Sequence, residues 1–172
     1  MKKITFTISY LLFFCMTAYS QADKDGPSNV MKSLNERITR EMPGWTHQAI
    51  EPIDGSKNVV IELWERGDIA VKIAITEYDD SAASSQALRE FKRNLQVEED
   101  ATKSRGRKGF RLIKENLSTL GEDGLTWDIR GSEALIFRKG EFVVSISVVR
   151  PEPNTDSYFS QTFGRQVAEV LR

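Results

Sequence analysis

The feature that most constrains the fold is a short pattern that occurs twice in the chain. In each copy an aromatic residue is followed by two charged residues, a glycine, an acid and an apolar run. The copies are Trp64–Ile73 and Phe137–Ile146. Glycine adopts positive φ easily, and tight hairpin turns need positive φ where side chains with a Cβ avoid it. The pattern therefore predicts two antiparallel hairpins that turn at Gly67 and Gly140.

The segments on either side of each hairpin extend the similarity. Upstream, Gly44–His47 and Gly124–Trp127 each predict a first strand. Downstream, apolar residues at helical spacing predict helices over about 81–96 and 157–171. Asp79 and Asp80 precede the first and Asp156 precedes the second, and acids suit a helix N-terminus. Each unit is then strand–strand–strand–helix. An internal duplication and a chance likeness of two glycine hairpins both stay open from the sequence alone.

The predicted strands alternate between apolar and small or polar residues. The apolar positions include Ile61 and Leu63, then Ile69, Val71, Ile73 and Ile75, then Phe142, Val144, Ile146 and Val148. One sheet face is therefore strongly apolar and needs helices to cover it. A further helix is predicted over Asn29–Met42, with Ser28 or Asn29 as its cap, and it ends before Pro43 and Gly44.

These elements predict an α+β fold. We expect a mostly antiparallel sheet of about six strands, built from two pseudo-repeated strand–strand–strand–helix units plus the N-terminal helix, with the helices packed on one sheet face. This element order loosely resembles small α+β folds such as the Mog1/PsbP type, and no residue motif carries that resemblance.

The first twenty-two residues are typical of a secretory signal peptide. Lys2 and Lys3 precede an uncharged apolar run over 4–18, which is short for a helix that spans a bilayer. Small residues permit cleavage after Ser20 or after Ala22. Bulky residues precede Cys15, so we interpret it as part of the apolar run rather than as a lipid attachment site. We expect residues 23–28 to be a linker and 29–172 to be a single domain, exported to a bacterial periplasm or secreted, with no stable membrane span after cleavage.

Composition excludes several kinds of chemistry. The chain has 24 basic and 25 acidic residues, and the signal segment holds two lysines and no acid, so the processed chain carries a net charge of −3. That balance argues against nucleic acid as a partner. Cys15 is the only cysteine, so the processed chain has no thiol for nucleophilic, redox or metal chemistry. We predict no cofactor and no metal site.

Catalytic motifs are missing from the sequence. His47 is the only histidine, so a zinc site with two histidines is excluded. Neither a serine elbow nor a phosphate-binding glycine loop occurs. We name no catalytic residue. Carboxylates distant in sequence, or His47 as a general base, keep a hydrolase open as an alternative.

The most unusual local segment is basic. Lys103, Arg105, Arg107 and Lys108, with two glycines among them and Arg111 and Lys114 beyond, can contact an anionic group. We interpret residues 98–109 instead as a solvated connector between the two halves, in which the cations oppose the acids Glu98–Asp100 at a solvated helix end.

The tryptophans give a second candidate surface. Trp64 is opposite in phase to Ile61 and Leu63, which predicts that it lies on the less apolar sheet face, where it could stack on a ligand. Trp127 shares its phase with apolar neighbours, and we expect it in the core.

The sequence therefore favours a non-catalytic exported domain that binds a small ligand or an envelope protein. The alternatives are a small exported hydrolase and a component of an envelope assembly, and a homodimer is open in each case. A cleft where His47 meets a carboxylate would favour the hydrolase, and an open sheet face that bears Trp64 would favour binding.

Overall fold

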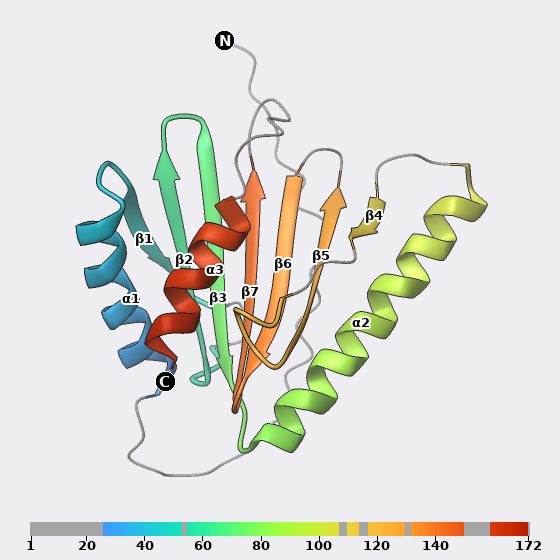
Figure 1. Cartoon of the computed structure of the whole chain (residues 1–172), viewed down its shortest axis with the longest axis horizontal. Helices are drawn as coiled ribbons and strands as arrows, with labels where there is room; N and C mark the ends of the chain where they lie inside the picture. The colour runs from blue at the N-terminus through green and yellow to red at the C-terminus, as the bar shows by residue number, and fades with distance from the viewer. Residues whose placement is uncertain are drawn as a thin grey trace.

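The computed structural model describes residues 26–52, 55–106, 110–113, 117–129, 132–149 and 159–171. These residues form a seven-stranded antiparallel sheet and three helices, which is an α+β architecture (Figure 1). The elements in chain order are α1 (Pro27–Glu41), β1 (Thr46–Ile50), β2 (Val59–Arg66), β3 (Ile69–Glu77), α2 (Ser81–Ser104), β4 (Phe110–Ile113), β5 (Asp123–Ile129), β6 (Ser132–Lys139), β7 (Phe142–Val149) and α3 (Phe159–Val170). The expected signal peptide and residues 23–25 of the expected linker lie outside the described residues, and residues 27 and 28 of that linker belong to α1.

Both predicted hairpins are present. β2 pairs with β3 and β6 pairs with β7, and each turn has a glycine at φ +59°, Gly67 and Gly140. No described atom would contact a Cβ added at either glycine. The glycines are therefore required by backbone conformation and not by lack of space.

The sheet order β1-β2-β3-β7-β6-β5-β4 places the two hairpins side by side at its centre. Ile73 pairs with Ile146, which is the residue it matches in the repeated pattern. The upstream similarity is out of register, because His47 pairs with Trp64 whereas Gly124 pairs with Phe137. The strand order is the one that a two-fold repeat gives, and the duplication itself stays a prediction.

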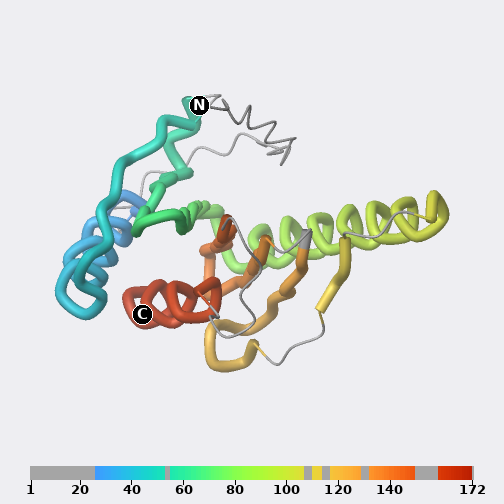
Figure 2. Tube along the Cα trace, turned by 90° about the horizontal axis from the view of Figure 1, so that it is seen from above, coloured from blue at the N-terminus to red at the C-terminus, as the bar shows by residue number. Residues whose placement is uncertain are grey.

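The helices cover both faces of the sheet, so the expectation that they share one face is wrong. On one side, here called the α1–α3 face, both terminal helices pack on the apolar alternation of β2, β3, β6 and β7. On the other side, the α2 face, α2 packs on β4 to β7 around Leu88, Trp127 and Ile136. Figure 2 shows α1 and α3 together on one side of the sheet and α2 on the other. The core position predicted for Trp127 is confirmed.

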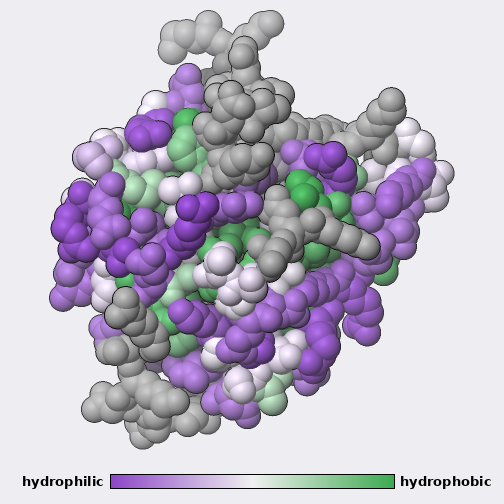
Figure 3. Space-filling model, in the orientation of Figure 1, coloured by the Kyte–Doolittle hydropathy of each residue, from purple (hydrophilic) through white to green (hydrophobic). Residues whose placement is uncertain are grey.

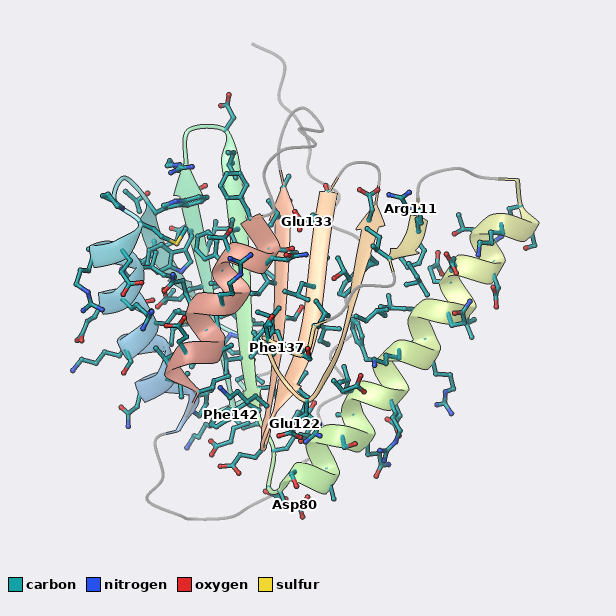
Figure 4. The ribbon with its side chains drawn as sticks, in the orientation of Figure 1. Asp80, Arg111, Glu122, Glu133, Phe137 and Phe142 are labelled. Carbon is teal, nitrogen blue, oxygen red and sulfur yellow. The ribbon has the colours of Figure 1, made fainter. Side chains whose placement is uncertain are left out.

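The α1–α3 face holds most of the buried apolar side chains. Leu34 and Ile38 of α1, Phe163 of α3 and Phe137 of β6 are fully buried there. Figure 4 shows Phe137 where α3 crosses the sheet, and in Figure 3 the outer surfaces of the helices are mainly hydrophilic. Arg37 links α1 to Gln166 and Glu169 of α3, which joins the two ends of the described chain.

Helix α2 is longer than the sequence predicts. Asp80 caps its N-terminus by accepting a hydrogen bond from the backbone N–H of Ala83 at 2.7 Å, as expected for an aspartate at that position. The helix continues to Ser104, so residues 98–104 of the expected connector are helical.

A seventh strand, β4, follows α2 and extends the sheet beyond the two predicted units. It contains Arg111, which Figure 4 shows at that edge of the sheet.

Helix α1 also starts earlier than predicted. It begins at Pro27, and Gly26 occupies the cap position without a side-chain hydrogen bond. Ser28 and Asn29 are therefore inside the helix and do not cap it. Proline fits the first helical position because its missing N–H would have no helical partner there.

Candidate functional site

A groove of about 360 Å³ runs between α1 and the β1–β2 strands. Its apolar lining comes from Met31, Ala49, Ile50, Pro52, Val59, Val60 and Ile61, and its polar lining from Ser28, Lys32, Asn35, Glu51 and Glu62. Most of these residues come from α1 and from the two strands at the β1 edge of the sheet. The volume is at the small end of the range for pockets that bind small molecules.

Glu62 is the unusual residue of this groove. It is only 7 % exposed and lies among apolar side chains of the α1–α3 face, because β2 turns Val60, Glu62 and Trp64 toward that face. One carboxylate oxygen, Oε1, accepts a hydrogen bond from Nδ2 of Asn35 on α1 at 2.6 Å. An ionised carboxylate is costly to bury unless it is paired, so this position needs an explanation beyond packing.

His47 approaches Glu62 from the exposed edge strand. Its Nδ1 lies 2.9 Å from Oε2 of Glu62, and its side chain is 36 % exposed. The imidazole also stacks on Trp64, with ring centroids 4.4 Å apart and the planes inclined by 23°. The single histidine of the chain is therefore held by a carboxylate on one side and an aromatic ring on another.

Two acceptor atoms of this cluster lack a hydrogen-bond donor. Oε2 of Glu62 and Oδ1 of Asn35 are buried, and no described group donates a hydrogen bond to either. The contact between His47 and Oε2 is close enough for a charge pair but does not have the geometry of a hydrogen bond. Buried polar atoms in native proteins nearly always have partners, so the two acceptors mark this cluster as a place where a donor is expected.

Trp64 is not on the less apolar face, and that prediction is wrong. It is fully buried and packs with Trp45 and Phe163 in the core of the α1–α3 face. The physical reason is register: Trp64 pairs with Val71, so it shares the face of the strongly apolar alternation of β3, and Ile61 and Leu63 point to the other side. The ring of Trp64 stacks on the imidazole of His47 from the core side. Because Trp64 is fully buried, it cannot itself stack on a ligand.

The basic residues separate into two kinds. Lys103 lies on α2 and forms an ion pair with Glu99 at 3.0 Å, which agrees with cations that oppose the acids of 98–100. Arg105 is exposed at the end of α2. Arg107 and Lys108 lie outside the described residues.

Glu99 is buried, and the expectation that it belongs to a solvated helix end is wrong. It is 7 % exposed, and one oxygen accepts a hydrogen bond from the backbone N–H of Leu112 on β4 at 3.1 Å. This backbone hydrogen bond, together with the hydrogen bond from Lys103, holds the pKa of Glu99 below its ordinary value of 4.5. Glu99 therefore fastens the short strand β4 to α2.

Within the described ranges, no cluster of three or more histidine, cysteine or acidic side chains is arranged to hold a metal ion. None of the described helices has the length and apolar character needed to cross a membrane.

Comparison with protein-family models, with characterised proteins and with solved structures gave no significant match to this chain. The function must therefore be argued from the site alone.

Sequence reasoning named His47 but missed Glu62 and Asn35. The sequence does contain a pattern that identifies Glu62. Glu62 and Trp64 are two residues apart on one strand and so lie on the same face, and assigning Trp64 to the core would have placed an acid in the core beside it. Asn35 had no such signal, because its place beside Glu62 depends on how α1 packs on the sheet.

Proposed function

We propose that this chain is an exported binding domain whose site is the groove between α1 and the β1–β2 strands. The observation that carries the proposal is the burial of Glu62 beside that groove with an oxygen that receives no hydrogen bond from the described residues. A buried charge of this kind does not contribute well to stability and is more readily explained by recognition.

The export part of the proposal is supported by the first twenty-two residues. The basic start, the apolar run and the small residues before Gln21 and Asp23 are the parts of a cleavable signal. Mass analysis of the exported protein should show an N-terminus at Gln21 or at Asp23. An intact Met1, or a lipid on Cys15, would overturn export as a soluble protein.

The groove can be tested with a matched pair of substitutions on β1. Ala49 and Gln48 are both exposed, and Ala49 lines the groove whereas Gln48 faces the opposite side of the sheet. Two-dimensional NMR of the exported protein, titrated with short aliphatic amines, alcohols and carboxylates, should perturb the amide signals of Asn35 and Val60. Ala49→Trp should abolish these changes by filling the groove, and Gln48→Trp should preserve them. The absence of any change at the groove with all three compound classes would overturn the proposal.

A second function is favoured by one specific observation, the contact between His47 and Glu62. The carboxylate lies 2.9 Å from Nδ1 without a hydrogen bond to it. A small rotation that makes this hydrogen bond would orient the imidazole so that Nε2 can take a proton from water, which is general-base hydrolysis. This is the arrangement that favours the hydrolase named among the alternatives. His47 is not among the residues that line the groove. The groove would therefore not place a substrate against His47, and we favour binding at the groove over hydrolysis.

The hydrolase can be tested separately from binding. If it is correct, the exported protein should hydrolyse p-nitrophenyl acetate above the rate of buffer, and His47→Gln should remove that rate while the groove still responds in the NMR titration. A rate equal to that of buffer, or an unchanged rate in His47→Gln, would exclude this role for His47.

A further inference from the structure

The two edges of the sheet are protected to different degrees. At one edge lies β4, where the backbone N–H of Leu112 points away from the sheet and donates a hydrogen bond to Glu99 of α2 at 3.1 Å. The same strand carries the exposed charge of Arg111. A charged side chain and a covering helix are two of the ways in which proteins prevent another strand from adding to a sheet edge. The β4 edge is therefore closed to further pairing.

The opposite edge, β1, lacks these protections among the described residues. All five residues of β1 are exposed, and the strand contains no acid, lysine, arginine, proline or glycine. Its pairing with β2 is continuous over the five residues, and no described group outside β2 forms a hydrogen bond with its backbone. Helix α1 packs against β2 and β3, and Figure 1 shows β1 at the end of the sheet. The outward N–H and C=O groups of β1 are therefore available to another strand.

The sequence of β1 suits pairing with a second copy of itself. A two-fold axis through Gln48 makes two β1 strands antiparallel and pairs all five residues of each. Thr46 then faces Ile50 of the second copy, and two β-branched side chains pair well across strands. His47 faces Ala49 of the second copy, which leaves room for the imidazole. This register opposes no like charges along the strand.

The charges at the two ends of β1 favour the same register. Glu51 is exposed at one end, on the α1–α3 face where it lines the groove. At the other end the exposed Arg66 lies over Trp45, with its guanidinium carbon 4.7 Å from the ring centroid. The register brings Glu51 opposite Trp45 of the second copy, and so beside Arg66 of that copy. Within one copy the two charges are about 20 Å apart along the strand, at about 3.3 Å per residue, so they can pair only between copies.

We propose that the chain forms a two-fold symmetric dimer by antiparallel pairing of β1, centred on Gln48, with an ion pair between Glu51 and Arg66 at each end. The two sheets become one, and the joined sheet ends at the two protected β4 edges, so the assembly stops at two copies. Five paired residues bury less area than a standard interface of about 1,600 Å². We therefore expect a weak dimer, with a dissociation constant of about 100 µM.

Exchange of the two charges tests the register. In Glu51→Lys and in Arg66→Glu like charges meet across the interface, so each variant alone should be monomeric in analytical ultracentrifugation at concentrations where the exported wild type is a dimer. In an equimolar mixture the introduced lysine faces the introduced glutamate, and the native Arg66 faces the native Glu51. The mixture should therefore recover the dimer, which also shows that both variants are folded. A wild type that stays monomeric at about ten times the expected dissociation constant, or a mixture of folded variants that stays monomeric, would overturn the proposal.

A matched pair of lysine variants tests the edge itself. Gln48→Lys sets two like charges beside each other at the two-fold axis, and lysine on an edge strand discourages pairing. We expect it to weaken dimerisation by about ten-fold or more. Gln86→Lys makes the same change on the exposed surface of α2 and should alter the affinity by less than about two-fold. Equal affinities in the two variants would mean that association does not use β1 and would overturn the proposal.

Discussion

The β1–β3 half of the sheet and the β5–β7 half contain the same glycine hairpin, but they are covered differently. In the second half, β6 and β7 lie between α3 on one face and α2 on the other, and four consecutive residues of β6 are buried. In the first half, α1 covers one face of β2 and β3, and every residue of β1 is exposed. Four consecutive residues of β3 are also buried, so the accessible region is the β1 edge of the first half rather than the whole half.

The two halves also treat a buried carboxylate differently. Glu99, which packs against β4 beyond the second half, receives hydrogen bonds from a backbone N–H and from Lys103. Glu62, in the first half, is equally buried but keeps an oxygen without a donor among the described residues. Of the five buried polar side-chain atoms that lack a partner in the described part of the chain, four lie in α1, in β2 or between them. This concentration of unpaired atoms is one reason why we propose the binding groove at this end of the sheet.

The largest expected effect tests whether stability is concentrated in the covered centre of the sheet rather than at its β1 edge. Phe137 is fully buried between α3 and the sheet, and Ile50 is 37 % exposed at the groove. Phe137→Ala should lower the free energy of unfolding by about 3–5 kcal/mol, whereas Ile50→Ala should change it by less than about 1 kcal/mol. Urea unfolding at neutral pH measures both, and similar losses would remove the contrast between the covered centre and the β1 edge.

Substitution of the two turn glycines should lower stability by the same amount in both hairpins, since both glycines have the same φ. Gly67→Val and Gly140→Val should each lower the free energy of unfolding by about 1–2 kcal/mol, because a β-branched residue resists positive φ. Urea unfolding of both variants checks this, with Glu65→Ala, at an exposed position of strand β2, as the control for a substitution that needs no unusual φ. An unchanged midpoint in either glycine variant would contradict the requirement for a left-handed residue at that turn.

The two carboxylates should respond to neutralisation with opposite signs. Glu99→Gln should lower the melting temperature, because the backbone N–H of Leu112 and Lys103 lose their charged partner. Glu62→Gln should leave the melting temperature unchanged or raise it, because it removes a buried charge that is incompletely paired. Thermal unfolding followed by circular dichroism provides the comparison, and equal losses in the two variants would mean that Glu62 is as structural as Glu99.

The pH dependence sharpens the same comparison. The pKa of Glu99 is lower in the folded chain than its ordinary value of 4.5, so folding favours the ionised form. The contribution of Glu99 to stability is complete above pH 4.5. It is lost as the pH falls through the pKa that Glu99 has in the folded chain. The difference in melting temperature between wild type and Glu99→Gln should therefore be largest near neutral pH and shrink as the pH falls below 4.5. A difference that persists in acid would contradict this assignment.

The smallest effect is expected at the basic segment. Simultaneous replacement of Arg105, Arg107 and Lys108 by glutamine should leave the free energy of unfolding nearly unchanged, because exposed charges without close partners contribute little. Urea unfolding and a sedimentation assay with anionic lipid vesicles test the two interpretations. Salt-sensitive association with the vesicles that the triple variant loses would make this segment, and not the groove, the binding region.

Local patterns predicted the parts of this fold that depend on neighbouring residues. The positive φ of Gly67 and Gly140, the cap at Asp80 and the apolar alternation of β3 and β7 all follow from short-range chemistry. The strand β4 and the side of the sheet on which α2 lies depend on contacts between distant segments, above all Glu99 with Leu112, which no local pattern encodes. The prediction for Trp64 was wrong for a related reason. The sheet face on which it lies is set by its pairing with Val71 and cannot be read from its own strand alone.

The central pairing of β3 with β7 also determines how this chain must fold. Each hairpin closes over two turn residues and can form quickly, but Glu77 meets Phe142 only after α2, β4, β5 and β6 have been passed. Closing so long a loop carries an entropic cost that slows folding. The pairing of Ile73 with Ile146 is therefore expected to be the late, rate-limiting event, in which two preformed hairpins join and the apolar surface that both leave exposed disappears.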